Sequence, residues 1–555
     1  MTAIGNNRYI YYYITHKYII QFFKLEDDSF PITINDTMNF DVKDKKELIL
    51  ITIISTAIVA YYINFNANLG IYCSDVYVYL LNALYYAGTN IHSTKSIYLS
   101  PIICFLTSLI FDLGYVDKVA IFIVTGILAI IGNIGFYLLL KLRFNNLLSL
   151  TGTIIYATLA LNLTWLANGS LDVPAVAFTI WLVYFAILAI KKNPKYYIAV
   201  FPLFVVGFFT RYTVGLILPP LLLYYFYENS FKIKRDDLKY ILIGFVLAIA
   251  LFVLIASVIM SMGDGNLVFD GMLSNGIQGN LGSTHDNAYN PDFGYYLLNI
   301  GNFISSSNTT FVGKTPALNN PTLLSGFVFL ILIVGAALWT KRIKFELTKT
   351  KIAGIILCLI ALITFTRFSS TITIIITLIG LFLIGKDSKY KMGIFMLAWI
   401  LTYLIFQSYY IVKVNRYIIP IFPALVYFII VGVDEINAKI NRKNILPIIL
   451  IVLFLIQGFV FTYTFEDTNE FNAPEQMCDY IKANIDNWSD IQIGNYNIRP
   501  YYWYLGLNSP GIESKSPQKI IDSNVSYYIS NIEQTNLTGY VEIKKIENLY
   551  LYQKI

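Results

Sequence analysis

A long series of apolar runs constrains the fold of this chain more than any other feature of its sequence. The runs recur between residues 48 and 464 and are separated by short polar segments. Hydrophobic residues occupy 56% of the 555 positions and charged residues only 13%, against roughly 25% charge in soluble proteins. A soluble enzyme, a disordered chain and a receptor with a single membrane anchor are therefore excluded. We predict a polytopic α-helical membrane protein.

Thirteen of these runs are candidate membrane helices, although several are shorter than a full span. The runs around Arg211 are read as two helices, because one continuous helix would bury this cation near the bilayer centre at a cost of several kcal/mol. The predicted segments are 48–67, 116–140, 147–167, 173–190, 197–210, 212–227, 239–261, 321–340, 352–367, 370–385, 392–409, 417–434 and 445–464.

The distribution of Lys and Arg predicts the orientation of the chain in the membrane. With the N-terminus in the cytoplasm, the inner side carries 26 of the 40 basic residues (six in residues 1–47 and 20 in six inner loops), and the outer loops before residue 466 carry seven. Lys and Arg accumulate on the cytoplasmic side of membrane proteins. We therefore predict an N-in/C-out orientation, which agrees with an odd number of crossings.

The expected domain organisation has three parts, of which the middle one contains the thirteen runs. Residues 1–47 form a cytoplasmic segment in which 8–25 could be an interfacial amphipathic helix. The transmembrane domain covers 48–465 and has two long outer loops. These loops are 68–115, with surface helices expected at 75–87 and 98–114, and 262–320, a Gly- and Asn-rich candidate lid.

The composition becomes more polar after residue 465. We therefore predict that residues 466–555 form a small extracytoplasmic α/β domain. Its expected elements are helices at 472–486 and 499–505, a strand at 491–496, and strands within 525–530 and 549–555.

Two acidic residues at the outer membrane boundary are candidate catalytic groups. Asp75 follows the first membrane helix, and Asp172 begins the fourth. One carboxylate could accept a proton from an incoming hydroxyl while the other orients the electrophile or balances its charge. The alternative is that each aspartate only caps the helix that it begins.

Three outer arginines, Arg211, Arg367 and Arg416, interrupt apolar runs where the positive-inside rule disfavours them. A cation at such a position needs an anionic partner, and a lipid phosphate is one candidate. The aromatic neighbours, among them Tyr417, fit an interfacial position. Pairing with bilayer headgroups or with the outer carboxylates is the alternative, and Arg367 is the weakest of the three candidates.

The sequence identifies no cofactor. His285 and Asp286 could pair with Asp75 or Asp172 around a divalent cation, so a divalent cation stays open, although a histidine in a Gly/Asn-rich loop is more often only solvated. The chain has no phosphate-binding glycine loop and no Ser-His-Asp set, so the energy for a reaction must come with the substrate. The charges gather at membrane faces, and no nucleic-acid partner is expected.

Several motifs in order resemble the GT-C membrane glycosyltransferases, specifically the dolichyl-phosphate-mannose protein mannosyltransferase and aminoarabinose transferase group. The resemblance covers roughly 48–435. Its most specific motif is NRYIIPIFPALVYF (415–428). The others are Asp75 with Tyr79 one helical turn later, YLSP (98–101), LDVPAVAF (171–178) and GFFTRYTVGLILPPLLLY (207–224). Val76 stands where many relatives have a second acid.

The resemblance implies an inverting transfer of a sugar from a polyprenyl-phosphate donor to an acceptor hydroxyl at the outer face. By position, Asp75 would be the catalytic base and Asp172 would contact sugar or acceptor. The lipid phosphate would be held by Arg211 and Arg416 beside Tyr417. Further candidates for substrate contact are Tyr79, Tyr98 and His285. The acceptor could be a protein, a lipid or a glycan.

Two alternatives stay open from the sequence: a transporter of a lipid or polar solute, and a non-catalytic scaffold. A transporter would place Asp75 and Asp172 deep in the core along a through-channel. A transferase would place them beside Arg211 and Arg416 at one face. A scaffold would tolerate the loss of the Asp75 carboxylate.

Overall fold

The computed structural model describes residues 42–555 except 90–98, 230–231, 233, 263–291, 313–314, 343–346, 386–389, 411, 441–443, 467 and 507–510. The expected interfacial helix at 8–25 and the candidate residues Tyr98 and His285 lie outside the described residues. So does the larger part of the candidate lid.

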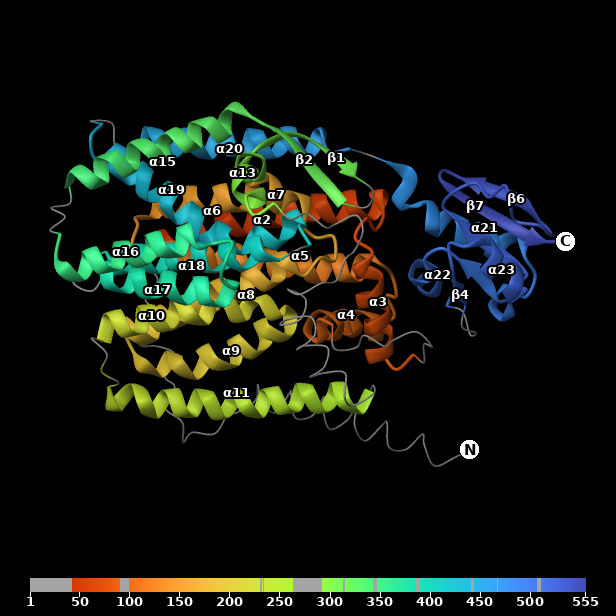
Figure 1. The fold of residues 1–555 in the computed structure, drawn as a ribbon, viewed down its shortest axis with the longest axis horizontal. Helices are drawn as coiled ribbons and strands as arrows, with labels where there is room; N and C mark the ends of the chain where they lie inside the picture. The colour runs from red at the N-terminus through yellow and green to blue at the C-terminus, as the bar shows by residue number, and fades with distance from the viewer. Residues whose placement is uncertain are drawn as a thin grey trace. The chain divides into compact units, whose positions relative to one another are not determined.

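Each of the thirteen predicted membrane segments coincides with a helix or with two consecutive helices. In Figure 1 the long helices lie side by side, and α11 forms one edge of the helical region in this view. They are α2 (Val42–Leu69), α5 (Val119–Lys141), α6 (Asn146–Thr158), α7 (Ala160–Thr164), α8 (Asp172–Lys191), α9 (Tyr197–Thr210), η3 (Tyr212–Ile217), α10 (Leu218–Asn229), α11 (Arg235–Met262), α15 (Leu323–Arg342), α16 (Lys349–Ile363), α17 (Ser370–Gly385), α18 (Lys391–Tyr409), η5 (Asn415–Ile421), α19 (Phe422–Asn437) and α20 (Ile445–Tyr463).

Eight helical spans among the described residues are long and apolar enough to cross a membrane. The chain is therefore a membrane protein, as predicted. The other predicted segments form shorter or interrupted helices, such as α9, α16 and α17. A count of thirteen crossings and the N-in/C-out orientation stay predictions.

Two predicted helices are interrupted near the candidate site. The run 147–167 divides into α6 and α7 at Leu159, where the backbone turns to an extended ψ of 134°. Asn162 satisfies a backbone oxygen near this break, because its side-chain amide donates to the Tyr156 carbonyl at 2.6 Å. The run 417–434 begins as the 3-10 helix η5, which contains Pro420 and precedes Pro423. Proline removes a helical donor and thus favours such irregular turns.

Small residues allow close helix crossings in this bundle. A Cβ atom added to Gly335 on α15 would lie 2.3 Å from the Cα atom of Gly432 on α19. Only glycine permits the two backbones to approach this closely, as in other membrane helix pairs. The α15–α19 crossing therefore depends on both glycines.

Helices α3 (Asp75–Tyr86) and α4 (Pro101–Asp112) lie in the segments 75–87 and 98–114, where helices were predicted, and they pack against each other. The segment 262–320, predicted to be a long loop, contains elements that the sequence did not predict. Short helices α13 (Tyr295–Leu298) and α14 (Ile300–Ile304) precede an antiparallel hairpin of β1 (Ser306–Val312) and β2 (Thr315–Pro321). The Gly- and Asn-rich composition of 262–320 indicated a loop, and the pairing of β2 with β1 overrides that local preference.

Residues 469–555 contain a five-stranded sheet in the order β4-β3-β5-β7-β6. Strand β3 pairs in parallel with β4 and β5, while β7 is antiparallel to β5 and β6. The strands are β3 (Ile493–Asn495), β4 (Ile512–Glu513), β5 (Tyr527–Ser530), β6 (Tyr540–Ile546) and β7 (Leu549–Lys554), and the helices are α21 (Ala473–Asn484), α22 (Ile498–Leu505) and α23 (Pro517–Ser523).

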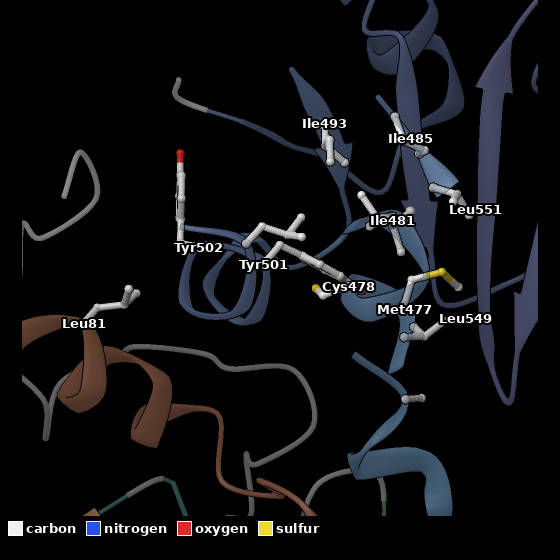
Figure 2. Close-up of a cluster of buried hydrophobic side chains, with 13 residues drawn as sticks. Leu81, Met477, Cys478, Ile481, Ile485, Ile493, Tyr501, Tyr502, Leu549 and Leu551 are labelled. Carbon is white, nitrogen blue, oxygen red and sulfur yellow. The ribbon is translucent and has the colours of Figure 1, made fainter. Parts of the chain in front are cut away.

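An apolar cluster links this sheet region to α3. Tyr501 and Tyr502 of α22 are buried with Met477, Cys478 and other residues of the sheet region, and Leu81 of α3 belongs to the same cluster. In Figure 2 the Leu81 side chain extends from α3 toward the helix that carries both tyrosines. The aromatic rings of Tyr77 on α3 and Tyr504 on α22 add an edge contact at 6.0 Å. Asp75 therefore lies on a helix that the C-terminal region contacts.

A second contact fixes the segment that precedes the sheet region. The Lys118 ammonium, with only 7% of its side chain exposed, forms an ion pair with Glu475 and donates to Asn472 Oδ1 at 3.2 Å. Gly70, which follows α2, has a φ of +94°, and a Cβ atom there would lie 2.6 Å from the Phe471 backbone. The loop that leads to Asp75 is thus packed directly against Phe471 and Asn472.

Candidate active site

Asp75 is held at the start of α3 by a single short loop after α2. The loop places the carboxylate next to η5, where Arg416 Nη2 donates to Asp75 Oδ2 at 2.7 Å. The Asp75 side chain is 44% exposed, whereas the Arg416 side chain is nearly buried. One face of the carboxylate thus binds the guanidinium while the other stays open.

Arg416 is the residue that joins the elements of the site. Its Nη1 donates to the Cys73 sulfur at 2.7 Å, two residues before Asp75. The guanidinium carbon lies 5.1 Å from the centre of the Trp165 ring and 5.6 Å from that of Tyr417. Such stacking stabilises a planar cation where little water reaches it.

Asp172, the first residue of α8, is fully buried. Its Oδ1 lies 3.0 Å from Arg211 Nη1, and its Oδ2 lies 3.6 Å from Arg416 Nε. The hydroxyl of Ser170 also donates to Oδ2 at 2.9 Å. Arg211 stacks at 4.9 Å on the ring of Tyr417. The Asp172 carboxylate therefore faces two arginines and a hydroxyl, and not open space.

The site combines two carboxylates with two guanidinium groups in one chain of ion pairs, in which the contact of Arg416 with Asp75 is also a hydrogen bond. Pairing with the outer carboxylates, an alternative that the sequence left open for the arginines, is what the structure shows for Arg211 and Arg416. The shared partner is Arg416, which contacts both Asp75 and Asp172. A bound anion could compete for either arginine, because each guanidinium has more donors than one carboxylate uses.

The pKa of Asp75 results from two opposing effects. Burial of the carboxyl raises its pKa. The charge of Arg416, the hydrogen bond that it donates and the charges of Arg499 and Arg211 together lower the pKa by a larger amount. The net pKa lies below the ordinary value for an aspartate. Asp75 is therefore ionised at neutral pH and can accept a proton only after its interaction with Arg416 weakens.

The other predicted site residues have different surroundings. Tyr79, one turn after Asp75, is buried, and burial raises the pKa of its phenol well above the ordinary value, so it is neutral. Arg367 is exposed between α16 and α17. Among the described residues, no group of three His, Cys, Asp or Glu side chains could hold a metal ion.

Three residues of the site, Cys73, Ser170 and Trp165, were not singled out from the sequence. Cys73 and Ser170 each lie two positions before an aspartate of the site, which is the only local signal for them. Trp165 stacks on Arg416 and donates from its ring nitrogen to Asn415 Oδ1 at 3.0 Å. Trp165 has no sequence signal that separates it from an ordinary structural residue, whereas Asn415 is the first residue of the motif 415–428.

The family of dolichyl-phosphate-mannose-protein mannosyltransferases matches residues 99–256 of the chain. Among solved structures, ArnT from Cupriavidus metallidurans bound to undecaprenyl phosphate superposes with a TM-score of 0.58 and 10% sequence identity, over 91% of this chain and 98% of that chain. The chain has a GT-C fold. The same protein without ligand gives a TM-score of 0.58 at 10% identity, over 92% of this chain and 98% of that one.

The resemblance noted from the sequence is thereby confirmed. The part that matches the mannosyltransferase family contains Asp172 and Arg211, whereas Asp75 and Arg416 lie outside it. The oligosaccharyltransferase of Archaeoglobus fulgidus is less similar, with a TM-score of 0.47 and 10% identity over 88% of this chain and 70% of that chain. A search of curated proteins gives no significant match.

Proposed function

We propose that this GT-C protein is an inverting glycosyltransferase that moves a sugar from a polyprenyl-phosphate donor to an acceptor hydroxyl at the outer face of the membrane. One observation carries the proposal: Asp75 and Asp172 meet Arg211 and Arg416 in a single cluster. A transferase requires this arrangement, because the base and the cations that receive the leaving phosphate must lie close together.

In this mechanism Arg416 changes partner when the donor binds. The phosphodiester of the donor carries one negative charge, as a carboxylate does, and it can bind a guanidinium through two oxygens, so it competes with Asp75 for Arg416. Loss of this hydrogen bond raises the pKa of Asp75, since the burial of its surroundings then dominates. The carboxylate becomes a stronger base when the donor is in place, and not before.

The transfer step then forms one bond and breaks one. The acceptor oxygen attacks the anomeric carbon while its proton passes to Asp75, and the bond between that carbon and the phosphate oxygen breaks. The electron pair stays on the polyprenyl phosphate, whose charge Arg211 and Arg416 stabilise. Attack opposite to the leaving phosphate inverts the anomeric configuration.

We assign Asp172 a positioning role within the same mechanism. It lies between Arg211 and Arg416 and is buried, so it can hold both guanidinium groups in place for the phosphate without contact with bulk water. Tyr417 supports the same geometry, because its ring stacks on both arginines. Direct contact between Asp172 and the sugar would require a movement of one arginine.

The decisive experiment measures sugar turnover by the purified protein in lipid with a polyprenyl-phosphate-linked sugar and membrane extracts as acceptor source. We expect Asp75→Asn to lower turnover by about 10²- to 10⁴-fold with donor binding retained. Asp486→Asn, which removes an exposed carboxylate of the C-terminal region, should leave turnover unchanged. Absence of binding and of turnover in the wild type, together with solute flux in sealed vesicles, would instead support a transporter.

A further inference from the structure

A second polar site lies at the ends of α5 and α8 that are remote from the candidate active site. A cavity of about 540 Å³ is lined there by residues that include Arg143, Lys191, Lys192, Leu188, Tyr390 and Met392. Helix α8 begins with Asp172 in the candidate active site and ends with Lys191 in this cavity. Its 20 residues place the two sites about 30 Å apart.

The lining carries an excess of positive charge. Three lining residues are cations, and none of the described lining residues is acidic. Glu228, which is not part of the lining, lies 3.4 Å from Lys191 and 3.5 Å from Lys391, so two lysines share this one carboxylate. Lys192 is exposed and has no acidic partner among the described residues. An anionic group would therefore neutralise charge that the described residues around the cavity leave uncompensated.

The arginine of the cavity is fixed in place. Arg143 donates to the Tyr427 hydroxyl on α19, and its guanidinium carbon lies 5.2 Å from the centre of the Tyr427 ring and 5.3 Å from that of Phe144. These contacts leave further guanidinium donors for an anion. A preorganised arginine of this kind loses less conformational entropy on binding than a free one.

The rest of the lining is apolar. Leu142, Ile187, Leu188 and Met392 complete the wall, and the two helix ends that carry three of them belong to membrane helices. A cationic rim over an apolar wall suits a ligand with a charged head and a hydrocarbon tail. Cationic pockets between membrane helices bind lipid headgroups in this way.

We propose that this cavity binds the phosphate headgroup of an anionic lipid in the leaflet opposite the candidate active site. The general attraction of Lys and Arg to one side of the membrane explains why cations gather at these helix ends. This general attraction alone predicts that substitution of any lysine of the 191–195 loop has the same effect on lipid binding. A specific lipid-binding site predicts instead that only the lysines that line the cavity, Lys191 and Lys192, affect lipid binding. The proposal does not depend on the glycosyltransferase reaction.

Native mass spectrometry of the full chain tests the site with vesicles of phosphatidylglycerol or phosphatidylcholine as the lipid source. We expect the wild type to retain phosphatidylglycerol, and Lys192→Gln to lower retention about fivefold. Lys195→Gln is the matched control, because Lys195 belongs to the same loop, is exposed and is not part of the lining. It should retain the lipid like the wild type.

Equal retention of both lipids by the wild type, or equal losses in Lys192→Gln and Lys195→Gln, would overturn the proposal. Arg143→Gln serves as a second variant, with its thermal midpoint measured because it also loses the Tyr427 contact. Inorganic phosphate at millimolar concentration separates the two sources of the same chemistry. If it displaces phosphatidylglycerol from the wild type, the ligand is a soluble phosphate and the lipid assignment is wrong.

Discussion

Arg416 donates a hydrogen bond to Asp75 at 2.7 Å, although 341 residues separate the two in the sequence. The cation proposed to receive the leaving phosphate therefore restrains the proposed base in the resting protein. This arrangement links the basicity of Asp75 to the presence of the donor. An unoccupied site has a weak base, and water entering it would not be activated.

The first prediction concerns the pH dependence of the reaction. In the wild type the pKa of Asp75 is depressed, so the acid limb of kcat/KM should lie below about pH 4, the ordinary aspartate range. In Arg416→Gln the burial of the site dominates and raises the pKa, so the acid limb of the residual kcat/KM should move to higher pH. An unchanged limb would show that Arg416 does not control the ionisation of Asp75.

The same ion pair predicts how stability responds to acid. A carboxylate with a depressed pKa in the folded state stabilises the protein above its unfolded-state pKa, and this contribution is lost as the pH falls through the folded-state pKa. Wild type and Asp75→Asn should therefore differ in thermal midpoint at pH 7 and converge toward pH 3. A pH-independent difference would mean that packing, and not charge, accounts for the effect.

A double-mutant cycle tests the pairing of Asp172 with Arg211. Asp172→Asn leaves the Arg211 guanidinium without its carboxylate, and Arg211→Gln leaves the buried Asp172 carboxylate with Arg416 as its remaining cationic partner. A loss of about 3–5 kcal/mol is the upper range for such changes. We expect the double variant to be less destabilised than the sum of the single variants, because their effects share one interaction. Thermal midpoints of the detergent-solubilised proteins provide the measurement. Additive effects would contradict direct coupling.

Two glycines with the same backbone conformation test the contact of the Asp75 loop with the C-terminal region. Gly70 and Gly114 both have a φ above +90°, so alanine at either costs about 1–2 kcal/mol of strain. Only at Gly70 does the added Cβ atom meet another backbone, that of Phe471, whereas nothing lies within 4 Å at Gly114. Gly70→Ala should therefore unfold at lower temperature than Gly114→Ala and expose residues 466–472 to protease.

The Lys118–Glu475 ion pair gives a milder test of the same contact. Glu475→Gln removes the charge beside a lysine that is almost buried, and we expect a loss of about 1–3 kcal/mol in local stability. Amide hydrogen exchange in α21 should accelerate, while exchange in α15, the helix that carries Gly335, should stay unchanged. Equal acceleration in both helices would indicate general destabilisation of the protein.

The sequence predicted the helices well, because membrane helices depend on local hydrophobicity. It did not predict the break at Leu159 or the hairpin 306–321. The break depends on an asparagine that contacts a carbonyl six residues earlier. The hairpin depends on strand pairing and on Gln457 of α20, which donates to the Ser306 carbonyl at 2.9 Å. Neither interaction leaves a periodic pattern in the sequence.

The candidate site was predictable as a set of residues but not as a geometry. Asp75, Asp172, Arg211 and Arg416 attract notice because charge is costly near apolar runs. Their mutual distances depend on how α2, α8, α9 and η5 pack, which one sequence does not specify. Cys73 and Trp165 were missed for the same reason, since only the position of Arg416 gives them a role.

Helix α8 is anchored by charge at both of its ends, by Arg211 at Asp172 and by Glu228 at Lys191. An independent tilt or slide of this helix would break one of these anchors. The two ion pairs therefore hold the ends of α8 at a fixed separation of about 30 Å, which is close to the hydrocarbon thickness of an average bilayer. In a thinner or thicker bilayer the lipids around the protein must stretch or compress to match it.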